Sequence, residues 1–316
     1  MKLHTEKEVF KNIIEAASHN LPLPIKEEYI EKDYWITLLL CRLAKSKYAG
    51  ETVFKGGTSL SKGFGLINRF SEDVDIAIID ENKKSGNEIK TIIRTVEKEM
   101  TKELTELQVE GVTSKGSRFR KSVFEYASID AVNKSNKLIV EVNSFANPFP
   151  FQSLIIKSLL YDFLSQTGNK NIIEQYDLHP FKINVLNKEQ TLMEKLISLI
   201  RFSFEENVVE SISQKIRHFY DLYFLMNDDA CAAFIKSADF KKQFDKILNH
   251  DKEMFDEPKG WKTKSVTESP LIKDFEPIWK QLKEKYKSEL SALAFTEIPD
   301  EKEVSEQFRN LIKMIL

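Results

Sequence analysis

A proline-rich break at residues 146–153 (ANPFPFQS) divides the chain into two parts with different hydrophobic patterns. Before the break, short apolar or alternating runs predict strands at 52–56, 73–79, 122–128 and 137–145. Helical spacing of apolar residues predicts helices there at 6–19, 26–46, 58–67 and 88–107. After the break almost everything is predicted to be helical, at 153–165, 188–206, 210–227, 230–236, 238–249, 270–290 and 301–315. We therefore expect an α+β protein with a mixed α/β domain over residues 1–150 and an α-helical domain over residues 151–316.

Composition places the chain among ordinary globular proteins. It has 316 residues, of which 41% are hydrophobic and 30% charged. No apolar run reaches the roughly 18 residues needed to cross a bilayer, and the N-terminus lacks a signal-peptide core, so we expect a cytoplasmic protein with no membrane partner. Cys41 and Cys231 both lie in apolar helical stretches and are expected to be reduced and packed. The five histidines show no metal-ligand spacing, so a zinc site is not expected.

The pair Gly56-Gly57, followed by Thr58, lies between a predicted strand and a predicted helix. Glycine allows a positive φ and the close approach of a ligand, and the start of a helix presents free N–H groups to an anion. Thr58 could cap this helix or bond a phosphate oxygen. Taken alone, the motif fits a structural turn better than a ligand site.

Two aspartates, Asp73 and Asp75, lie two residues apart on a predicted strand and should point to the same face. Neighbouring carboxylates repel each other unless a cation lies between them, and Mg²⁺ or Mn²⁺ accepts carboxylates together with nucleotide phosphates. The alternative is an acidic strand end exposed to water. Glu141, which interrupts an apolar strand, is the candidate third acid, unless it faces solvent at a sheet edge, and Glu125 is a weaker rival.

Basic residues near these acids have both functional and structural interpretations. Arg69 could hold a phosphate with its planar guanidinium or form a structural ion pair, and Ser71 could bond a phosphate or cap the strand entry. The stretch 114–121 (SKGSRFRK) is a candidate nucleic-acid patch or a solvated loop. The net charge of −2 gives no global support for nucleic-acid binding.

The sequence GGT at 56–58 followed by RFSEDVD at 69–75 resembles the AbiEii/AbiGii toxin family of nucleotidyltransferases, within the polymerase-beta-like superfamily. The resemblance extends to EKDYW at 31–35, LMEKLISLIRF at 192–202 and KIRHFYDLYFL at 215–225. The last two motifs centre on Lys195 and Asp221. Lys195 could reach a triphosphate as a mobile charge or be a solvated lysine, and Asp221 should be paired, with Lys195 and Arg217 as candidate partners.

The resemblance implies a bilobed fold with a cleft between the lobes, an NTP substrate and Mg²⁺. It implies a toxin of a toxin–antitoxin or phage-abortive-infection system that transfers NMP, with tRNA 3′ ends as the acceptor for some members and a winged-helix antitoxin as the partner. The site would use Asp73, Asp75, Lys195 and Asp221 in catalysis, Gly56, Gly57, Thr58, Arg69 and Ser71 at the nucleotide, and Glu141 at the metal. Two alternatives stay open, namely nucleotide or phosphate transfer to a protein hydroxyl, and an inactive nucleotide-binding module.

Overall fold

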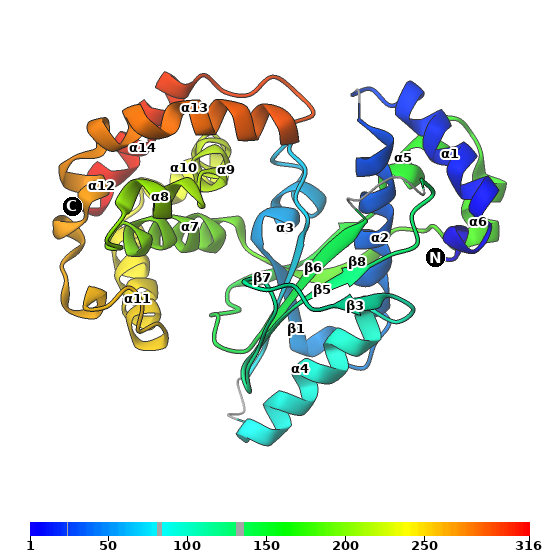
Figure 1. The fold of residues 1–316 in the computed structure, drawn as a ribbon, viewed down its shortest axis with the longest axis horizontal. Coiled ribbons are helices and arrows are strands. Elements are labelled where there is room, and N and C mark those ends of the chain that lie inside the picture. The colour runs from blue at the N-terminus through cyan, green and yellow to red at the C-terminus, as the bar shows by residue number, and fades with distance from the viewer. Residues whose placement is uncertain (24, 81–83, 131–135) are drawn as a thin grey trace. The chain divides into compact units, whose positions relative to one another are not determined.

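The computed structural model describes residues 1–23, 25–80, 84–130 and 136–316, which form two compact units (Figure 1). Unit 1 comprises Met1–Gly65 and Phe70–Leu186, and unit 2 comprises Leu66–Arg69 and Asn187–Leu316. No described helix is long and apolar enough to span a membrane.

Unit 1 is built on one mixed sheet, which has eight strands within the described residues. Their order is β3-β5-β6-β2-β1-β8-β7, and β4 pairs with β5 outside this path. The strands are β1 (Thr52–Lys55), β2 (Asp73–Ile78), β3 (Thr105–Leu107), β4 (Ser114–Lys115), β5 (Phe119–Glu125), β6 (Lys137–Asn143), β7 (Phe151–Ile156) and β8 (Phe181–Leu186).

Strand β2 lies in the middle of this sheet, antiparallel to β1 and parallel to β6. Val74 and Ile76 are fully buried, whereas Asp73 and Asp75, on the opposite face, are only partly buried. The alternation of the sequence therefore predicted this strand correctly. Because both neighbouring strands are paired to it, β2 has no open edge and its register is fixed.

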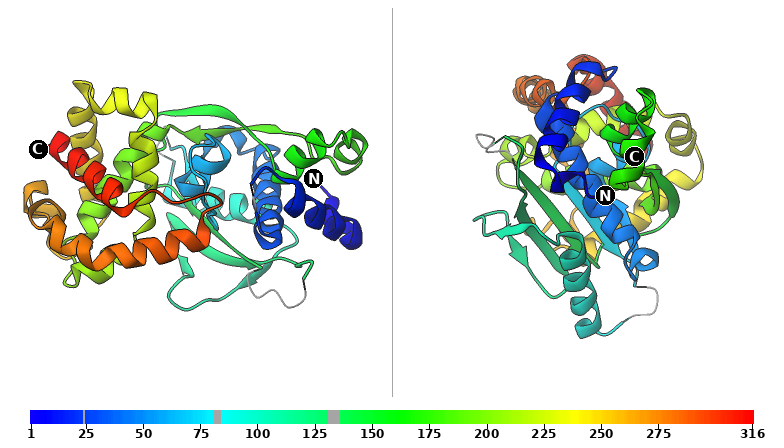
Figure 2. Two further views of the ribbon diagram at one scale, coloured as in Figure 1. Left: turned by 90° about the horizontal axis from the view of Figure 1, so that it is seen from above. Right: turned by 90° about the vertical axis from the view of Figure 1, so that its right-hand side faces the viewer.

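Helices cover the sheet of unit 1 (Figures 1 and 2). Helix α2 is buried along most of its length, including the charged residues Glu31, Lys32 and Asp33. Helix α4 begins with a capping box formed by Ser85 and Glu88. The helices are α1 (Lys7–Asn20), α2 (Glu27–Ala44), α3 (Gly56–Lys62), α4 (Gly86–Met100), α5 (Leu159–Gln166) and α6 (Lys170–Tyr176), with short 3₁₀ turns at Leu3–Thr5 and Ala49–Glu51.

The expected helix at 153–165 is wrong in its first part. Residues Phe151–Ile156 form strand β7, and the helix begins only at Leu159, where Ser158 caps it. Strand β7 pairs with β8, which pairs in turn with β1. Both strands therefore complete the sheet of unit 1, and the units divide after Leu186 rather than near the residue 150 that the prolines suggested.

Two other expectations differ in their ends. Helix α3 begins at Gly56, not at Thr58, and ends at Lys62 with Gly63 as its C-cap, and the left-handed Gly65 follows with a φ of 61°. Helix α4 ends at Met100, and the expected continuation to residue 107 instead turns at Glu103, with a φ of 73°, into the short strand β3.

Unit 2 is helical, as expected, and its described residues form no strand apart from an isolated bridge between Arg69 and Ala294. Aromatic side chains fill its core, where the rings of Phe219 and Phe308 lie 4.7 Å apart and Trp279 is 5.1 Å from Phe219. The helices are α7 (Lys188–Phe202), α8 (Val208–Ser213), α9 (Arg217–Met226), α10 (Asp229–Ile235), α11 (Asp239–Met254), α12 (Pro270–Lys273), α13 (Phe275–Leu293) and α14 (Glu301–Ile315), with 3₁₀ turns at Trp261–Thr263 and Val266–Glu268.

Candidate active site

The pairing of β2 with β6 brings three carboxylates onto neighbouring strands of unit 1. Asp75 lies directly opposite Glu141, and Asp73 lies two residues before Asp75 on the same face of β2. Strand β6 lies between β5 and β2, so Glu141 is not at a sheet edge. The rival acid, Glu125, lies on β5, which β6 separates from β2. The structure thus groups Glu141, and not Glu125, with the two aspartates.

The lysines near Asp75 do not offset the effects of burial and of the neighbouring carboxylates on its pKa. Burial raises its pKa to about 8, and the carboxylates of Glu141 and Asp73 add to the rise. Lys55 and Lys121 oppose this shift without cancelling it. Lys121 Nζ lies 3.8 Å from Glu141 Oε2. A raised pKa of this origin marks a place where a bound cation would relieve repulsion.

These acids suit a divalent metal ion that takes its remaining ligands from a bound phosphate group and water. Within the described residues, no three His, Cys, Asp or Glu side chains are close enough to enclose an ion by themselves. Mg²⁺ in nucleotide enzymes is commonly held by one or two carboxylates together with substrate phosphates and water, so a closed cage is not needed. The donor set of Asp73 and Asp75, with Glu141 alongside, fits that kind of site.

The glycine turn lies against the acids. Gly56 has a φ of 80°, and a Cβ atom at this position would lie 2.1 Å from Asp75 Oδ2. Glycine is therefore required here both for the left-handed backbone and for the close approach of the carboxylate. Because α3 begins at Gly56, the N–H groups of its first turn have no helical acceptor.

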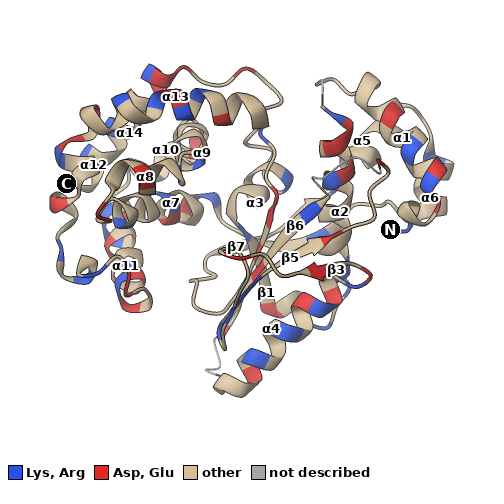
Figure 3. Cartoon of the chain, viewed as in Figure 1, with Lys and Arg blue, Asp and Glu red and all other residues tan. Residues whose placement is uncertain are grey.

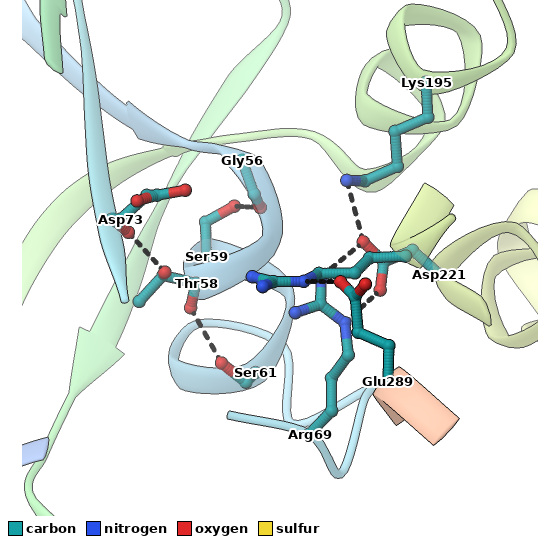
Figure 4. A network of polar contacts seen from close by, with 10 residues as sticks. Gly56, Thr58, Ser59, Ser61, Arg69, Asp73, Lys195, Asp221 and Glu289 are labelled. Atoms are coloured by element: carbon teal, nitrogen blue, oxygen red, sulfur yellow. Dashed lines mark hydrogen bonds and ion pairs between the residues drawn. The ribbon is translucent and has the colours of Figure 1, made fainter. Parts of the chain in front are cut away.

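The hydroxyl groups of α3 bind main-chain oxygens. Thr58 Oγ1 donates to the carbonyl oxygen of Asp73, which ties α3 to the start of β2 (Figure 4). Ser59 Oγ donates to Gly56 O at 2.8 Å. Thr58 does not cap the helix, contrary to one expectation, since the N-cap residue is Lys55. Ser71 is buried, two residues before Asp73.

In unit 2, Asp221 is fully buried and binds two cations (Figure 4). Arg69 Nε lies 2.8 Å from Asp221 Oδ1 and Arg69 Nη2 lies 2.7 Å from Asp221 Oδ2. Lys195 Nζ lies 2.8 Å from the same Oδ2. Burial alone would raise the pKa of Asp221, but Arg69 and Lys195 outweigh it and hold that pKa well below its usual range. Two cations thus share one buried anion.

The sequence identified Lys195 as a partner of Asp221 but missed Arg69. Arg217, the other candidate, binds Glu289 instead, with 2.8 Å between Arg217 Nε and Glu289 Oε1. The bidentate geometry favours the ion-pair interpretation of Arg69. His218 is kept neutral, because burial, with Lys195 nearby, lowers its pKa well below the ordinary value. Lys195 lies on α7 and Asp221 on α9, two helices that pack together, so the predicted helices already carried this pair.

The basic stretch at 114–121 is largely neutralised by acids of unit 1. Lys115 pairs with Glu106 at 2.5 Å, and Arg120 with Glu97 at 2.5 Å, while Lys121 lies beside the acids described above. Arg118 is exposed. Acidic and basic residues also alternate along α4 (Figure 3). This distribution favours the interpretation of the stretch as a solvated strand and loop.

The model of one protein family, described as "Nucleotidyl transferase AbiEii toxin, Type IV TA system", matches residues 38–313. The chain belongs to the AbiEii family of nucleotidyltransferase toxins. It is therefore a nucleotidyltransferase of the type IV toxin–antitoxin class, which implies an NTP substrate, usually a divalent metal, and an antitoxin partner.

Comparison with curated proteins gives no significant match. Among solved structures, the chain is similar to MenT4, a nucleotidyltransferase toxin from Mycobacterium tuberculosis H37Rv, with 14% identity over 97% of this chain and 98% of that chain. The TM-score of the two structures is 0.39. The α+β fold expected from the sequence, with a mixed sheet followed by helices, is confirmed by the structure.

Proposed function

We propose that this toxin transfers NMP from an NTP to the 3′ end of an RNA, with tRNA as the acceptor, in a reaction that depends on Mg²⁺ or Mn²⁺. The observation that carries the proposal is the grouping of Asp73, Asp75 and Glu141 on paired strands beside the Gly56 turn. RNA as the acceptor rests on the family alone. NTP and tRNA are cytoplasmic compounds, which places the proposed reaction in the cytoplasm.

The acids would hold the metal and the turn would hold the nucleotide. Asp73 and Asp75 would be the principal ligands, with Glu141 assisting. Held by these residues, a divalent ion would lower the pKa of the acceptor hydroxyl and offset charge on the leaving pyrophosphate. In the reaction, the 3′ oxygen bonds to the α-phosphorus, the bond between the α- and β-phosphates breaks, and pyrophosphate leaves while the hydroxyl proton passes to solvent.

Helix α3 would bind the triphosphate through main-chain groups. The N–H groups of Gly56, Gly57 and Thr58 belong to its first turn and are free of helical acceptors. The bond from Thr58 to the carbonyl oxygen of Asp73 keeps this turn and the first metal-binding residue in a fixed relation. Ser71, on the segment that leads into β2, would complete the phosphate contacts.

Lys195 and Arg69 would supply positive charge to the phosphates, while Asp221 orients both. Both cations share the carboxylate of Asp221 in a buried environment. Their positive charge would attract a phosphate group. In this role Asp221 acts through the residues that it holds, and its carboxylate does not contact the substrate.

The test is to incubate the protein with each α-³²P-labelled NTP, total RNA and a protein extract in Mg²⁺. We expect label that is lost on RNase treatment and kept on protease treatment, and none with Asp73→Asn. The matched control is Glu125→Gln on the same sheet, which should retain transfer. Label in protein would support nucleotide transfer to a protein hydroxyl instead. Label that reaches protein only from γ-³²P-labelled NTP would support phosphate transfer, and no label from either form would support an inactive binding module.

A second experiment identifies the acceptor and the antitoxin. Sequencing of RNA 3′ ends after expression should show untemplated nucleotides on tRNA that are missing with Asp73→Asn. We propose that the antitoxin is a winged-helix protein encoded by a neighbouring gene, and its co-expression should restore growth. Growth arrest that persists with Asp73→Asn would contradict the catalytic origin of toxicity.

A further inference from the structure

Helix α2 carries three consecutive charged residues that are almost completely buried. Glu31, Lys32 and Asp33 are 1%, 2% and 9% exposed. Successive residues of a helix point about 100° apart, so the three side chains face different neighbours and form no single polar face. Burial of a charge costs several kcal/mol unless a partner offsets it. Apolar packing of the helix does not explain three buried charges, so the reason for them lies in the groups that these side chains bind.

Lys32 binds the residue that directly precedes the first metal-binding aspartate. Its Nζ lies 2.7 Å from Glu72 Oε1 and 5.5 Å from the ring centroid of Phe70. Glu72 has a side chain that is 40% exposed and would otherwise be free to turn into water. The ion pair therefore restricts the backbone and side chain immediately before Asp73.

Asp33 binds the far end of helix α3. Its Oδ1 lies 2.5 Å from Lys62 Nζ, and its Oδ2 accepts a bond of 2.8 Å from Leu159 N. Lys62 is the last residue of α3, whose first turn contains Gly56. Helix α2 thus holds both α3 and the entry to β2, the two elements that carry the candidate site.

We propose that Lys32, acting through Glu72, is a positioning residue that sets the carboxylate of Asp73 for metal binding. The inference rests on the proposed function. Replacing a buried ion pair by apolar residues is often neutral or stabilising, so stability alone gives little reason for a lysine here. Mutation of a residue that holds a metal ligand in place typically weakens metal affinity by about 10- to 100-fold.

The sign of the effect separates positioning from simple electrostatics. Lys32 is a cation close to acids that would bind a cation. Removing its charge should by electrostatics alone tighten the binding of a metal ion. If Lys32 positions Asp73, removing it should weaken that binding instead.

The experiment measures the binding of Mn²⁺ alone to the full chain by electron paramagnetic resonance. We expect Lys32→Met to weaken binding by about 10- to 100-fold. The matched control is Arg42→Met, which removes a cation of the same helix from an exposed partner, Glu103, 2.9 Å away, and should leave Mn²⁺ binding unchanged. Melting temperatures of both variants show whether each remains folded.

Variants of Glu72 test whether Lys32 acts through it. Glu72→Gln keeps an oxygen that accepts from Lys32 and should bind Mn²⁺ like the wild type, whereas Glu72→Ala should match Lys32→Met. The double variant Lys32→Met/Glu72→Ala should be no weaker than either single variant. Equal loss in Glu72→Gln and Glu72→Ala would mean that charge, not position, is what matters, and would overturn the inference.

The outcomes also separate this inference from the proposed function. If Asp73→Asn binds Mn²⁺ as well as the wild type does, the proposed metal site is wrong. If Asp73→Asn loses binding but Lys32→Met binds as tightly as Arg42→Met or more tightly, the metal site stands and the role of Lys32 is refuted.

Discussion

Replacing Asp75 by asparagine should stabilise the metal-free protein while it abolishes transfer. The pKa of Asp75 is raised from 3.8 to about 8 by burial and by the carboxylates of Glu141 and Asp73. The folded state therefore favours the protonated form more strongly than the unfolded state does. Ionisation of Asp75 consequently lowers the free energy of unfolding as pH rises from about 4 to about 8.

The magnitude follows from the pKa difference. Between about pH 4 and pH 7, roughly three pH units, Asp75 is ionised in the unfolded chain but keeps its proton in the folded chain. This difference lowers the free energy of unfolding at pH 7 by up to about 4 kcal/mol. Asparagine has nearly the same shape and no charge, so it should recover much of this energy. At roughly 2 °C per kcal/mol for a chain of this size, we expect the melting temperature to rise by up to about 8 °C.

The assay is thermal unfolding in EDTA between pH 5 and pH 8.5 for the wild type and Asp75→Asn. The difference between them should be small at pH 5 and grow towards pH 8. Glu125→Gln is the matched control, because Glu125 lies opposite Lys137 rather than among the acids, and it should not reproduce the gain in stability expected of Asp75→Asn. Added Mg²⁺ should stabilise the wild type more than Asp75→Asn.

A variant Asp75→Asn that is less stable than the wild type at pH 8 in EDTA would refute the reasoning. So would a difference in melting temperature that is the same at every pH. Either result would mean that the protein itself balances the charge of Asp75, so that no cation is needed at this position to offset it.

Three further predictions follow from the same residues. Gly56→Ala should lose transfer, since its Cβ would lie 2.1 Å from Asp75 Oδ2. Gly65→Ala, with a φ of 61° and open space around it, should lose only about 1 kcal/mol of stability and keep transfer. Equal activity of the two variants in the labelling assay would contradict this prediction. Asp221→Ala leaves two buried cations without their shared carboxylate and should reduce the free energy of unfolding in urea by about 3–5 kcal/mol, and a loss below about 1 kcal/mol would argue against the buried network. If Mg²⁺ binds Asp75 as proposed, it competes with the proton of that carboxylate, and its affinity measured by calorimetry should weaken up to about tenfold per unit as pH falls below about 8. An affinity that does not change between pH 8 and pH 6 would exclude Asp75 as a ligand.

The sequence by itself determined the features that depend on neighbours in the chain. The alternation in β2 places Asp73 and Asp75 on one face, and helical spacing predicts most helices of unit 2 within a few residues. A double glycine before a helix indicated a tight turn, and Gly56 makes one. These properties follow from the periods of strands and helices and from backbone sterics, which need no knowledge of distant residues.

Some interactions had a local signal that a pattern alone could not interpret. Residues Phe181–Leu186 alternate in the manner of a strand, yet no strand was predicted there. The consecutive charges of Glu31, Lys32 and Asp33 break an apolar helix, which indicates buried partners without naming them. In both cases the sequence indicated that a pairing partner was needed, and only the fold shows which residues provide it.

Only the tertiary structure decided which distant residues meet. Arg69 binds Asp221, which lies 152 positions away, while the nearby Arg217 binds Glu289. Glu141 joins Asp75 because β6 pairs in parallel with β2, a register that no local pattern encodes. The physical reason is that a charge can be buried only where the whole fold brings an opposite charge or a bound ion to it, so its partner is a property of the folded chain.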